Sequence, residues 1–191
     1  SVELARRPLS GKDSRASSTL RTAESGSPDI NSSAPRSSWV MPSQALLRHR
    51  SSAIGQFYVI TSVVAGRWRL FADPACAALL EEALQNSDRL GLTRSCAWVI
   101  MPDHFHWVIQ LRSGTLGRCV QSLKSRAAIA LNAHTSGFGA AVWQRGYYEH
   151  WIRNERDVRQ QAMYVMGNPV RAGLASALGH YPHAWCRWSL S

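Results

Sequence analysis

Two histidines flank Phe105 in the segment His104-Phe105-His106, and their spacing suits a metal site if the segment is a strand. Side chains at positions i and i+2 of a strand point to the same face, so both imidazoles would project together. Two neutral imidazoles on one face provide half of a metal site. The alternative interpretation is a pair of polar residues on a solvated sheet face. The apolar neighbours Trp107 and Val108 indicate a covered strand, where paired imidazoles favour a ligand role.

Tyr164 and Asn168 form a second candidate pair, four residues apart near the end of a segment with helical periodicity. This spacing places a phenol and a carboxamide on the same face of a helix. Two structural alternatives stay open: Tyr164 as an aromatic residue of the core, and Asn168 as a helix cap before Pro169. The residue before a proline is disfavoured in the helical conformation. We therefore expect the helix to break at Asn168, which would leave its side-chain oxygen free to point elsewhere.

The pattern of apolar residues predicts the elements that must position these groups. β-Branched and aromatic residues predict strands at residues 57–64, 96–101, 104–111 and 147–152. Apolar residues at helical spacing predict three helices, over residues 74–91, 116–134 and 155–167.

Turn and capping residues separate these elements. Asp73 followed by Pro74 predicts a helix start, and Pro102-Asp103 predicts the tight turn of a hairpin. Residues 67–71 are expected to form a short extended link, and residues 135–141 a glycine-containing loop. The resulting order, β-α-β-β-α-β-α, predicts an α+β fold in which helices cover one face of an antiparallel sheet.

Composition divides the 191 residues into two parts. Residues 1–40 contain eleven Ser and three Pro but a single aromatic residue, Trp39, so they cannot bury enough apolar surface to offset the entropy of ordering. We expect a disordered Ser/Pro-rich tail there and a single domain over residues 41–191. A hydrophobic share of 45% is sufficient for a core and excludes a wholly disordered chain.

The charge balance favours a nucleic-acid partner. Lys and Arg number 22 against 12 Asp and Glu, and the only lysines are Lys12 and Lys124, so arginine carries the excess of +10. Arginine binds phosphate with two parallel hydrogen bonds and stacks on bases. A genome rich in G·C pairs, which favours arginine codons, is the alternative explanation.

Cysteine usage and hydropathy exclude several other classes of protein. The four cysteines form no CxxC pair, which argues against a zinc ribbon or a redox dithiol, and we expect reduced thiols in the core. No apolar run approaches the roughly 18–20 residues of a membrane span, and the N-terminus lacks the apolar stretch of a secretory signal. These observations predict a cytoplasmic protein without a membrane partner.

Three separated motifs together resemble a known family. The segment from Trp98 to His106 (WVIMPDHFH) resembles the histidine–hydrophobic–histidine signature of the single-tyrosine HUH transposases. Residues 143–150 (WQRGYYEH) and 164–174 (YVMGNPVRAGL) resemble the REP-associated tyrosine transposase branch, in which a Tyr four residues before Asn-Pro-Val ends the catalytic helix. The resemblance runs from about residue 57 to residue 174. It implies the ferredoxin/RRM-like HUH nuclease fold.

The resemblance also implies an activity, that of a metal-dependent endonuclease and strand transferase acting on hairpins of single-stranded palindromic-repeat DNA. The residues that would hold one Mg²⁺ or Mn²⁺ are His104, His106 and Asn168. Tyr164 would attack the scissile phosphate, which gives a 5′-phosphotyrosine link and a free 3′-OH. We expect a monomer, and a dimer stays open.

Gly167, directly before Asn168, is a departure from the pattern of this branch. We expect a glycine at this position to loosen the helix end. If Asn168 moved away as a result, Glu149 or His150 would become the third metal ligand. The nucleophile would not change. The weaker candidates for that role are Tyr58, Tyr147, Tyr148 and Tyr181.

Basic, polar and aromatic residues near the motifs are expected to contact DNA. They are Arg48, Arg50, Lys124, Arg126, Trp143, Gln144, Arg145, Arg153 and Arg171. For any one of these arginines, a solvated surface charge is the alternative.

Two other functions compete with the transposase interpretation. A histidine-triad-like nucleotide hydrolase would require a third histidine at position 108, where this chain has Val108. A non-catalytic module that binds DNA repeats on the same fold is the second alternative, and it would keep Tyr164 only for packing.

Overall fold

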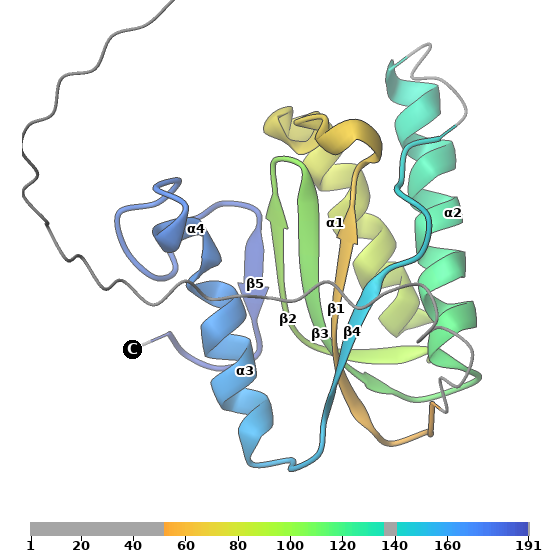
Figure 1. Ribbon diagram of the computed structural model, residues 1–191, viewed down its shortest axis with the longest axis vertical. Helices are drawn as coiled ribbons and strands as arrows, with labels where there is room; N and C mark the ends of the chain where they lie inside the picture. The colour runs from red at the N-terminus through yellow and green to blue at the C-terminus, as the bar shows by residue number, and fades with distance from the viewer. Residues whose placement is uncertain (1–51, 136–140, 191) are drawn as a thin grey trace, which may run out of the picture. The chain divides into compact units, whose positions relative to one another are not determined.

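The computed structural model describes residues 52–135 and 141–190, and the strands within them form an antiparallel sheet (Figure 1). The strands lie in the order β4-β1-β3-β2-β5. Their bounds are Phe57–Val63 (β1), Thr93–Met101 (β2), His104–Leu111 (β3), Tyr148–Ile152 (β4) and Ala184–Cys186 (β5). The predicted α+β class and antiparallel sheet are therefore confirmed.

Helices and short 3-10 turns connect these strands. Their bounds are Ala65–Arg67 (η2), Leu70–Ala72 (η3), Pro74–Arg89 (α1), Leu116–Thr135 (α2), Asp157–Met166 (α3) and Asn168–Arg171 (α4). The tail predicted at residues 1–40 lies outside the described residues, as do Arg48, Arg50 and residues 136–140 of the predicted loop.

β3 lies in the middle of the sheet and presents different side chains to its two faces. Phe105 and Trp107 are fully buried on one face, together with Ile109 and Leu111, and belong to the core that α1 and α2 complete. Each such aromatic or aliphatic side chain contributes about 1.5–3 kcal/mol when it is fully buried. The two histidines of β3 lie on the opposite face, as the period-two pattern predicts.

α3 covers part of this histidine face, so the helices divide between the two faces of the sheet. Val158 and Val165 of α3 are buried in a second cluster with Val99 of β2 and Val108 of β3. The expectation that all helices lie on one face is therefore corrected for α3. The physical reason is the composition of β2, which is buried at every residue from Ser95 to Met101 and needs cover on both faces.

The segment between β1 and α1 turns sharply instead of forming the predicted extended link. Gly66 and Arg67 both have positive φ, 62° and 54°, within and at the end of η2. The chain then makes a second 3-10 turn that buries Leu70 and Phe71. The amide of Phe71 donates to the carbonyl of Pro102 at 2.9 Å, which ties the segment to the β2–β3 turn. The chain turns here because the turn buries the apolar side chains of Leu70 and Phe71.

The helix start predicted at Asp73 is confirmed, because its Oδ1 accepts a hydrogen bond from the Ala75 amide at 2.9 Å.

β5 is the strand that the sequence pattern did not predict. It has three residues, and its Trp185 stacks on Trp98 of β2 with ring centroids 4.5 Å apart. This contact and three pairs of residues across the strands hold β5 at the edge of the sheet.

Two further expectations concern the chemistry of the whole chain. All four cysteines are free, and Cys76, Cys96 and Cys119 are buried, as predicted. Burial raises the pKa of each of these three thiols to about 11. Within residues 52–135 and 141–190, no helix is both long and apolar enough to cross a membrane.

A buried polar network joins the end of α1 to the beginning of β2. The Asp88 carboxylate accepts hydrogen bonds from the hydroxyl of Thr93 at 2.6 Å and from the amide of Ser95 at 2.9 Å. The Ser95 hydroxyl also donates to Asp88 and accepts from Nε1 of Trp107, at 2.9 Å, in the centre of the sheet. One carboxylate thus satisfies the polar groups of an irregular strand pairing between Ser95 and Ala97.

Replacing Asp88 with Ala should therefore lower the free energy of unfolding by about 2 kcal/mol, because buried donors lose their acceptor. Urea unfolding followed by circular dichroism measures this loss. Glu82→Ala removes an exposed carboxylate from the same helix and is the control, with an expected change within about 0.5 kcal/mol. Equal effects of the two substitutions would contradict the role given to the network.

Candidate active site

The two histidine side chains of β3 lie next to each other at the turn end of the β2–β3 hairpin. Their ring centroids are 4.9 Å apart and the rings are nearly perpendicular, at 87°. Nδ1 of His104 lies 2.6 Å from Oδ1 of Asp103, and Nδ1 of His106 lies 2.8 Å from Oγ1 of Thr61. When each Nδ1 carries the proton and donates to its partner, each Nε2 keeps its lone pair for a ligand.

The electrostatics of the pair keep one imidazole neutral. Burial lowers the pKa of His106 to about 3, and the positive charges of His104 and Arg171 act in the same direction. Burial acts to raise the pKa of Asp103, but the hydrogen bond and charge of His104, together with Arg67, hold it below its usual value. At neutral pH the site therefore contains a neutral imidazole at His106 and a carboxylate beside His104.

Tyr164 and Asn168 lie at the junction of α3 and α4 and remain close to each other. Gly167 between the two helices keeps helical backbone angles, φ −76° and ψ −8°, so the predicted spacing on one face is retained. Arg171 contacts both residues: its Nη2 donates to the Tyr164 carbonyl oxygen at 2.6 Å and to Asn168 Oδ1 at 2.7 Å. The Tyr164 side chain is no core aromatic, because the residue is 47% exposed.

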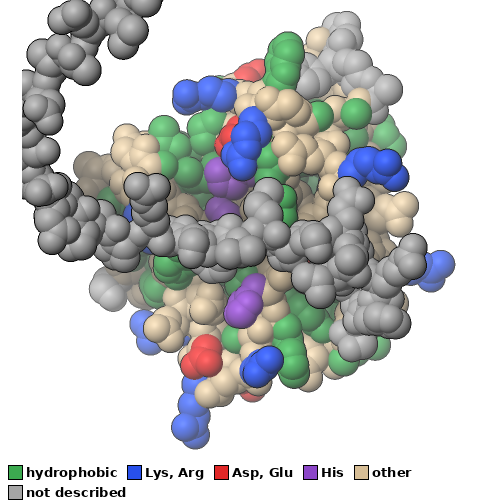
Figure 2. Space-filling view, viewed as in Figure 1, with side chains coloured by type: hydrophobic (Ala, Val, Ile, Leu, Met, Phe, Trp, Pro, Cys, Tyr) green, Lys and Arg blue, Asp and Glu red, His purple; other side chains and the backbone are tan. Residues whose placement is uncertain are grey.

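The end of α3 is held over the histidine face of the sheet. Val165 and Met166 are buried in the same cluster as Val99, Met101 and Val108 of β2 and β3. α4 also contacts β2, and the charge of Arg171 helps to lower the pKa of His106. Histidine side chains reach the surface of the face seen in Figure 2, where basic side chains are scattered over its described part.

The register of β4 decides between the alternative third ligands. Glu149 pairs with Ile60, whose own partner on β3 is Trp107, so Glu149 points to the face opposite the histidines and cannot join them. His150 lies on the histidine face but pairs with Val59, one row away from His106. Tyr148 is in the row of His106, because Thr61 pairs with both residues.

Three of the predicted DNA-contacting residues hold the segment before β4 in place. Lys124 of α2 donates from Nζ to the carbonyl oxygens of Gln144 and Gly146, at 2.9 and 2.6 Å, and burial lowers its pKa. Trp143 donates from Nε1 to the Lys124 carbonyl at 2.9 Å and packs its ring against Phe105. These contacts line a cavity of about 510 Å³ between α2 and this segment.

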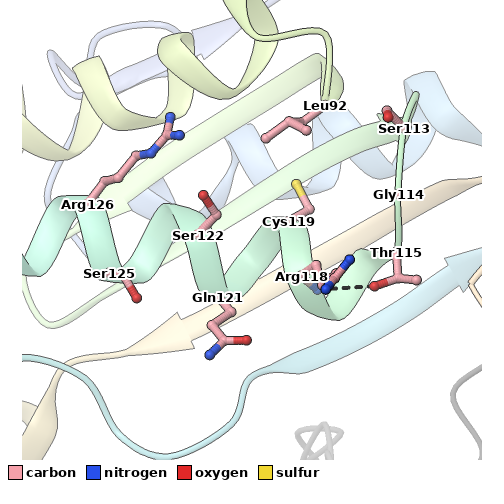
Figure 3. A pocket seen from close by; sticks show the side chains of 10 residues that line it. All are labelled: Leu92, Ser113, Gly114, Thr115, Arg118, Cys119, Gln121, Ser122, Ser125 and Arg126. Carbon is pink, nitrogen blue, oxygen red and sulfur yellow. Dashed lines mark hydrogen bonds between the residues drawn. The ribbon is translucent and has the colours of Figure 1, made fainter.

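The remaining predicted DNA contacts do not gather at one place. Arg126 lies on α2, on the side of the sheet away from the histidines, where it lines a cavity of about 600 Å³ with Arg118 (Figure 3). Arg145 and Arg153 are exposed, and the Arg153 guanidinium lies over the ring of Trp151 with 5.7 Å to its centroid. Only Arg171 lies at the candidate site itself among the predicted arginines that the structure describes. The DNA contacts stay predictions.

A second group of metal-ligating side chains lies where α1 begins and α2 ends. Ligand atoms of Asp73, Cys76 and His134 lie within 4.8 Å of one another. The sequence places Asp73 and Cys76 one helical turn apart, but only the pairing of α1 with α2 brings His134 to them. Asp73 already caps α1, and its Oδ2 lies 3.6 Å from Nε2 of His134, so helix capping and this polar contact account for the group.

Comparison with known proteins agrees with this fold. Residues 58–168 match the family described as "Transposase IS200 like", and the chain belongs to this family. A REP-associated tyrosine transposase of Escherichia coli (strain K12) is 31% identical over 87 residues, which are 45% of this chain and 50% of that protein. The chain thus spans half the length of this relative. The predicted family resemblance is confirmed.

Two further relatives extend the comparison. An uncharacterised protein of Haemophilus influenzae (strain Rd) is 26% identical over 159 residues, which are 65% of this chain and 86% of that protein. The solved structure of a REP-associated tyrosine transposase bound to a REP hairpin has the same fold, with a TM-score of 0.59 and 24% identity. The structural match covers 71% of this chain and 79% of the transposase chain.

The electrostatics of His106 predict a pH dependence of stability. Its pKa is about 3 in the folded chain and 6.5 as the reference value for the unfolded chain. The unfolded state therefore binds more protons between these values, and the free energy of unfolding should fall as the pH decreases from 7 to 4.5. The share of His106 in this fall is about 2 kcal/mol.

In His106→Asn, which keeps a donor near the position of Nδ1, this share of the loss should disappear. Urea unfolding at both pH values in EDTA measures it. His180→Asn, at an exposed histidine, should keep the pH dependence of the unsubstituted protein. A fall in His106→Asn as large as in the unsubstituted protein would show that His106 is not the group that titrates.

Proposed function

We propose that this chain is a metal-dependent single-stranded DNA endonuclease and strand transferase, which forms a covalent link between Tyr164 and a 5′-phosphate. The observation that carries the proposal is the placement of an exposed phenol at Tyr164 near the end of α3, which packs on the face of the sheet that carries the two histidines. Membership of the IS200-like transposase family supports it. The name of the Escherichia coli relative, a REP-associated tyrosine transposase, also supports it.

The residues of the site fit a divalent cation. His104 and His106 each have one ring nitrogen held by a neighbour, and His106 is neutral, so the donor set consists of two imidazole nitrogens. With the carboxamide oxygen of Asn168 as third donor, this set suits Mn²⁺, and Mg²⁺ with water ligands. When bound, the ion supplies Lewis-acid polarisation of a phosphoryl oxygen and offsets developing negative charge.

The reaction that this site supports is a transesterification. The Tyr164 phenol oxygen forms a bond to phosphorus, the bond from phosphorus to the 3′-oxygen breaks, and the phenol proton is released while the 3′-oxygen leaves as a hydroxyl. One phosphodiester replaces another, so the link keeps the energy needed to rejoin the strand. Water is not the nucleophile, and no carboxylate is required to activate it.

We propose hairpins of single-stranded palindromic repeats as the substrate. The REP hairpin in the solved structure of similar fold supports this choice, as does the net charge of +10. Action on genomic DNA would place the protein in the bacterial cytoplasm, and we propose that it acts as a monomer.

A non-catalytic DNA-repeat-binding module on the same fold is the second candidate. The observation that favours it is the hydrogen bond from Arg171 to Asn168 Oδ1, which engages the third donor of the site without an ion. Such a protein would bind hairpins but form no covalent link.

The deciding experiment incubates the protein with end-labelled hairpin single strands from its own genome, with and without Mn²⁺. We expect a metal-dependent band that survives denaturation in SDS and disappears in Tyr164→Phe. Tyr148→Phe is the matched control, because Tyr148 is a second exposed tyrosine on the histidine face, and its band should remain. Specific binding without a covalent band on any hairpin would favour the second candidate.

Removing one imidazole tests the metal separately from the nucleophile. His104→Ala or His106→Ala should reduce covalent product by about 100-fold, the upper end of the loss seen when a partner of a metal ligand is removed, while hairpin affinity in EDTA changes little. A gel-shift titration measures that affinity. Undiminished covalent product in both variants would contradict the metal assignment and leave Tyr164 as the nucleophile.

A further inference from the structure

The guanidinium of Arg171 joins the two chemical groups of the α3–α4 junction. Nη2 donates to the Tyr164 carbonyl oxygen at 2.6 Å and to Asn168 Oδ1 at 2.7 Å. Its Cζ lies 4.2 Å from the centroid of the Tyr164 ring, so the cation is stacked on the proposed nucleophile. Three separate contacts thus fix one side chain against Tyr164 and Asn168.

Gly167 provides the space for this guanidinium. A Cβ at position 167 would lie 2.7 Å from Nη1 of Arg171, closer than such atoms approach in proteins. The backbone of Gly167 is helical, with φ −76°, so any residue could adopt it and no conformational need explains the glycine. The guanidinium of Arg171 occupies the space that a side chain at this position would need. α3 ends at Met166, directly before Gly167, and the space for Arg171 is a further role of this glycine.

Arg171 also competes with a cation for the same oxygen. Asn168 Oδ1, the proposed third donor, already accepts a charged hydrogen bond from Arg171. The guanidinium carries a positive charge, which acts on His106 of the proposed ion site. A divalent ion beside it would be repelled. A phosphate, by contrast, accepts two parallel hydrogen bonds from arginine and binds it more strongly than a neutral amide does.

We propose that Arg171 is a positioning residue that holds Asn168 and Tyr164 in the DNA-free protein. It releases the Asn168 oxygen to the divalent ion when a DNA phosphate takes the guanidinium. The inference rests on the proposed function, because it requires the same ion site. Its consequence is coupling between the two ligands: hairpin DNA strengthens ion binding, and the ion strengthens hairpin binding by the same factor.

The test measures Mn²⁺ affinity by electron paramagnetic resonance of the free ion, in a Tyr164→Phe background that prevents cleavage and keeps the ring under Arg171. Without DNA, Arg171→Gln should bind Mn²⁺ about fivefold more tightly or better, the lower end of typical couplings. A hairpin single strand should tighten Mn²⁺ binding in the background protein, and much less in Arg171→Gln.

Two matched variants separate position from charge. Gly167→Ala expels the guanidinium but keeps its charge, and it should also bind Mn²⁺ more tightly without DNA. Arg153→Gln removes one exposed arginine charge elsewhere and should change the affinity by less than twofold. If Arg153→Gln tightened Mn²⁺ binding as much as Arg171→Gln does, the cause would be the change in net charge. That result would overturn the proposal.

His104→Ala in the same background distinguishes the failure of each idea. In one outcome, His104→Ala abolishes Mn²⁺ binding, while Arg171→Gln and Gly167→Ala leave it unchanged. This result overturns the role of Arg171, and the proposed function stands. Mn²⁺ binding that His104→Ala leaves unchanged overturns the proposed ion site, and the role of Arg171 with it.

Discussion

The central strand β3 has to satisfy two environments at once, and the rest of the fold depends on this constraint. One face carries Phe105 and Trp107 into a core that two long helices close. The other face carries His104 and His106, whose imidazoles need polar neighbours and an opening to solvent. Only a strand can separate the two sets so completely, because its side chains alternate. Any shift of register by one residue would exchange them.

The polar side of this strand is anchored by its neighbours in the sheet and in the adjoining turn. Asp103, in the turn, orients His104 and pairs with Arg67 at 3.1 Å. Its carbonyl accepts a hydrogen bond from the Val64 amide at 2.9 Å, which fixes the turn to the end of β1. Thr61 of β1 orients His106. The site is therefore rigid on the sheet side, and the groups on α3 and α4 are the ones left to adjust.

The sequence alone predicts the parts of this arrangement that local patterns encode. The predicted bounds of β3 agree with the structure to the residue, because polar and apolar residues alternate from His104 to Leu111 with Val108 as the exception. The face covered by α3 was not predicted, because an apolar run such as β2 does not say which helix covers which side. β5 has only three residues and therefore too short a pattern. The contact of Arg171 with Gly167 depends on side-chain placement, which no spacing rule provides.

The short strand β5 has a consequence for the behaviour of the whole chain. It covers the outer edge of β2 through three residue pairs, and the Ile100 amide donates to the His183 carbonyl beside them at 2.9 Å. β2 is nine residues long, and its residues 96–101 are all apolar. Without residues 181–190, its free backbone groups would form a template for a strand of another copy. β5 therefore protects the edge of β2 against aggregation, in addition to being part of the sheet.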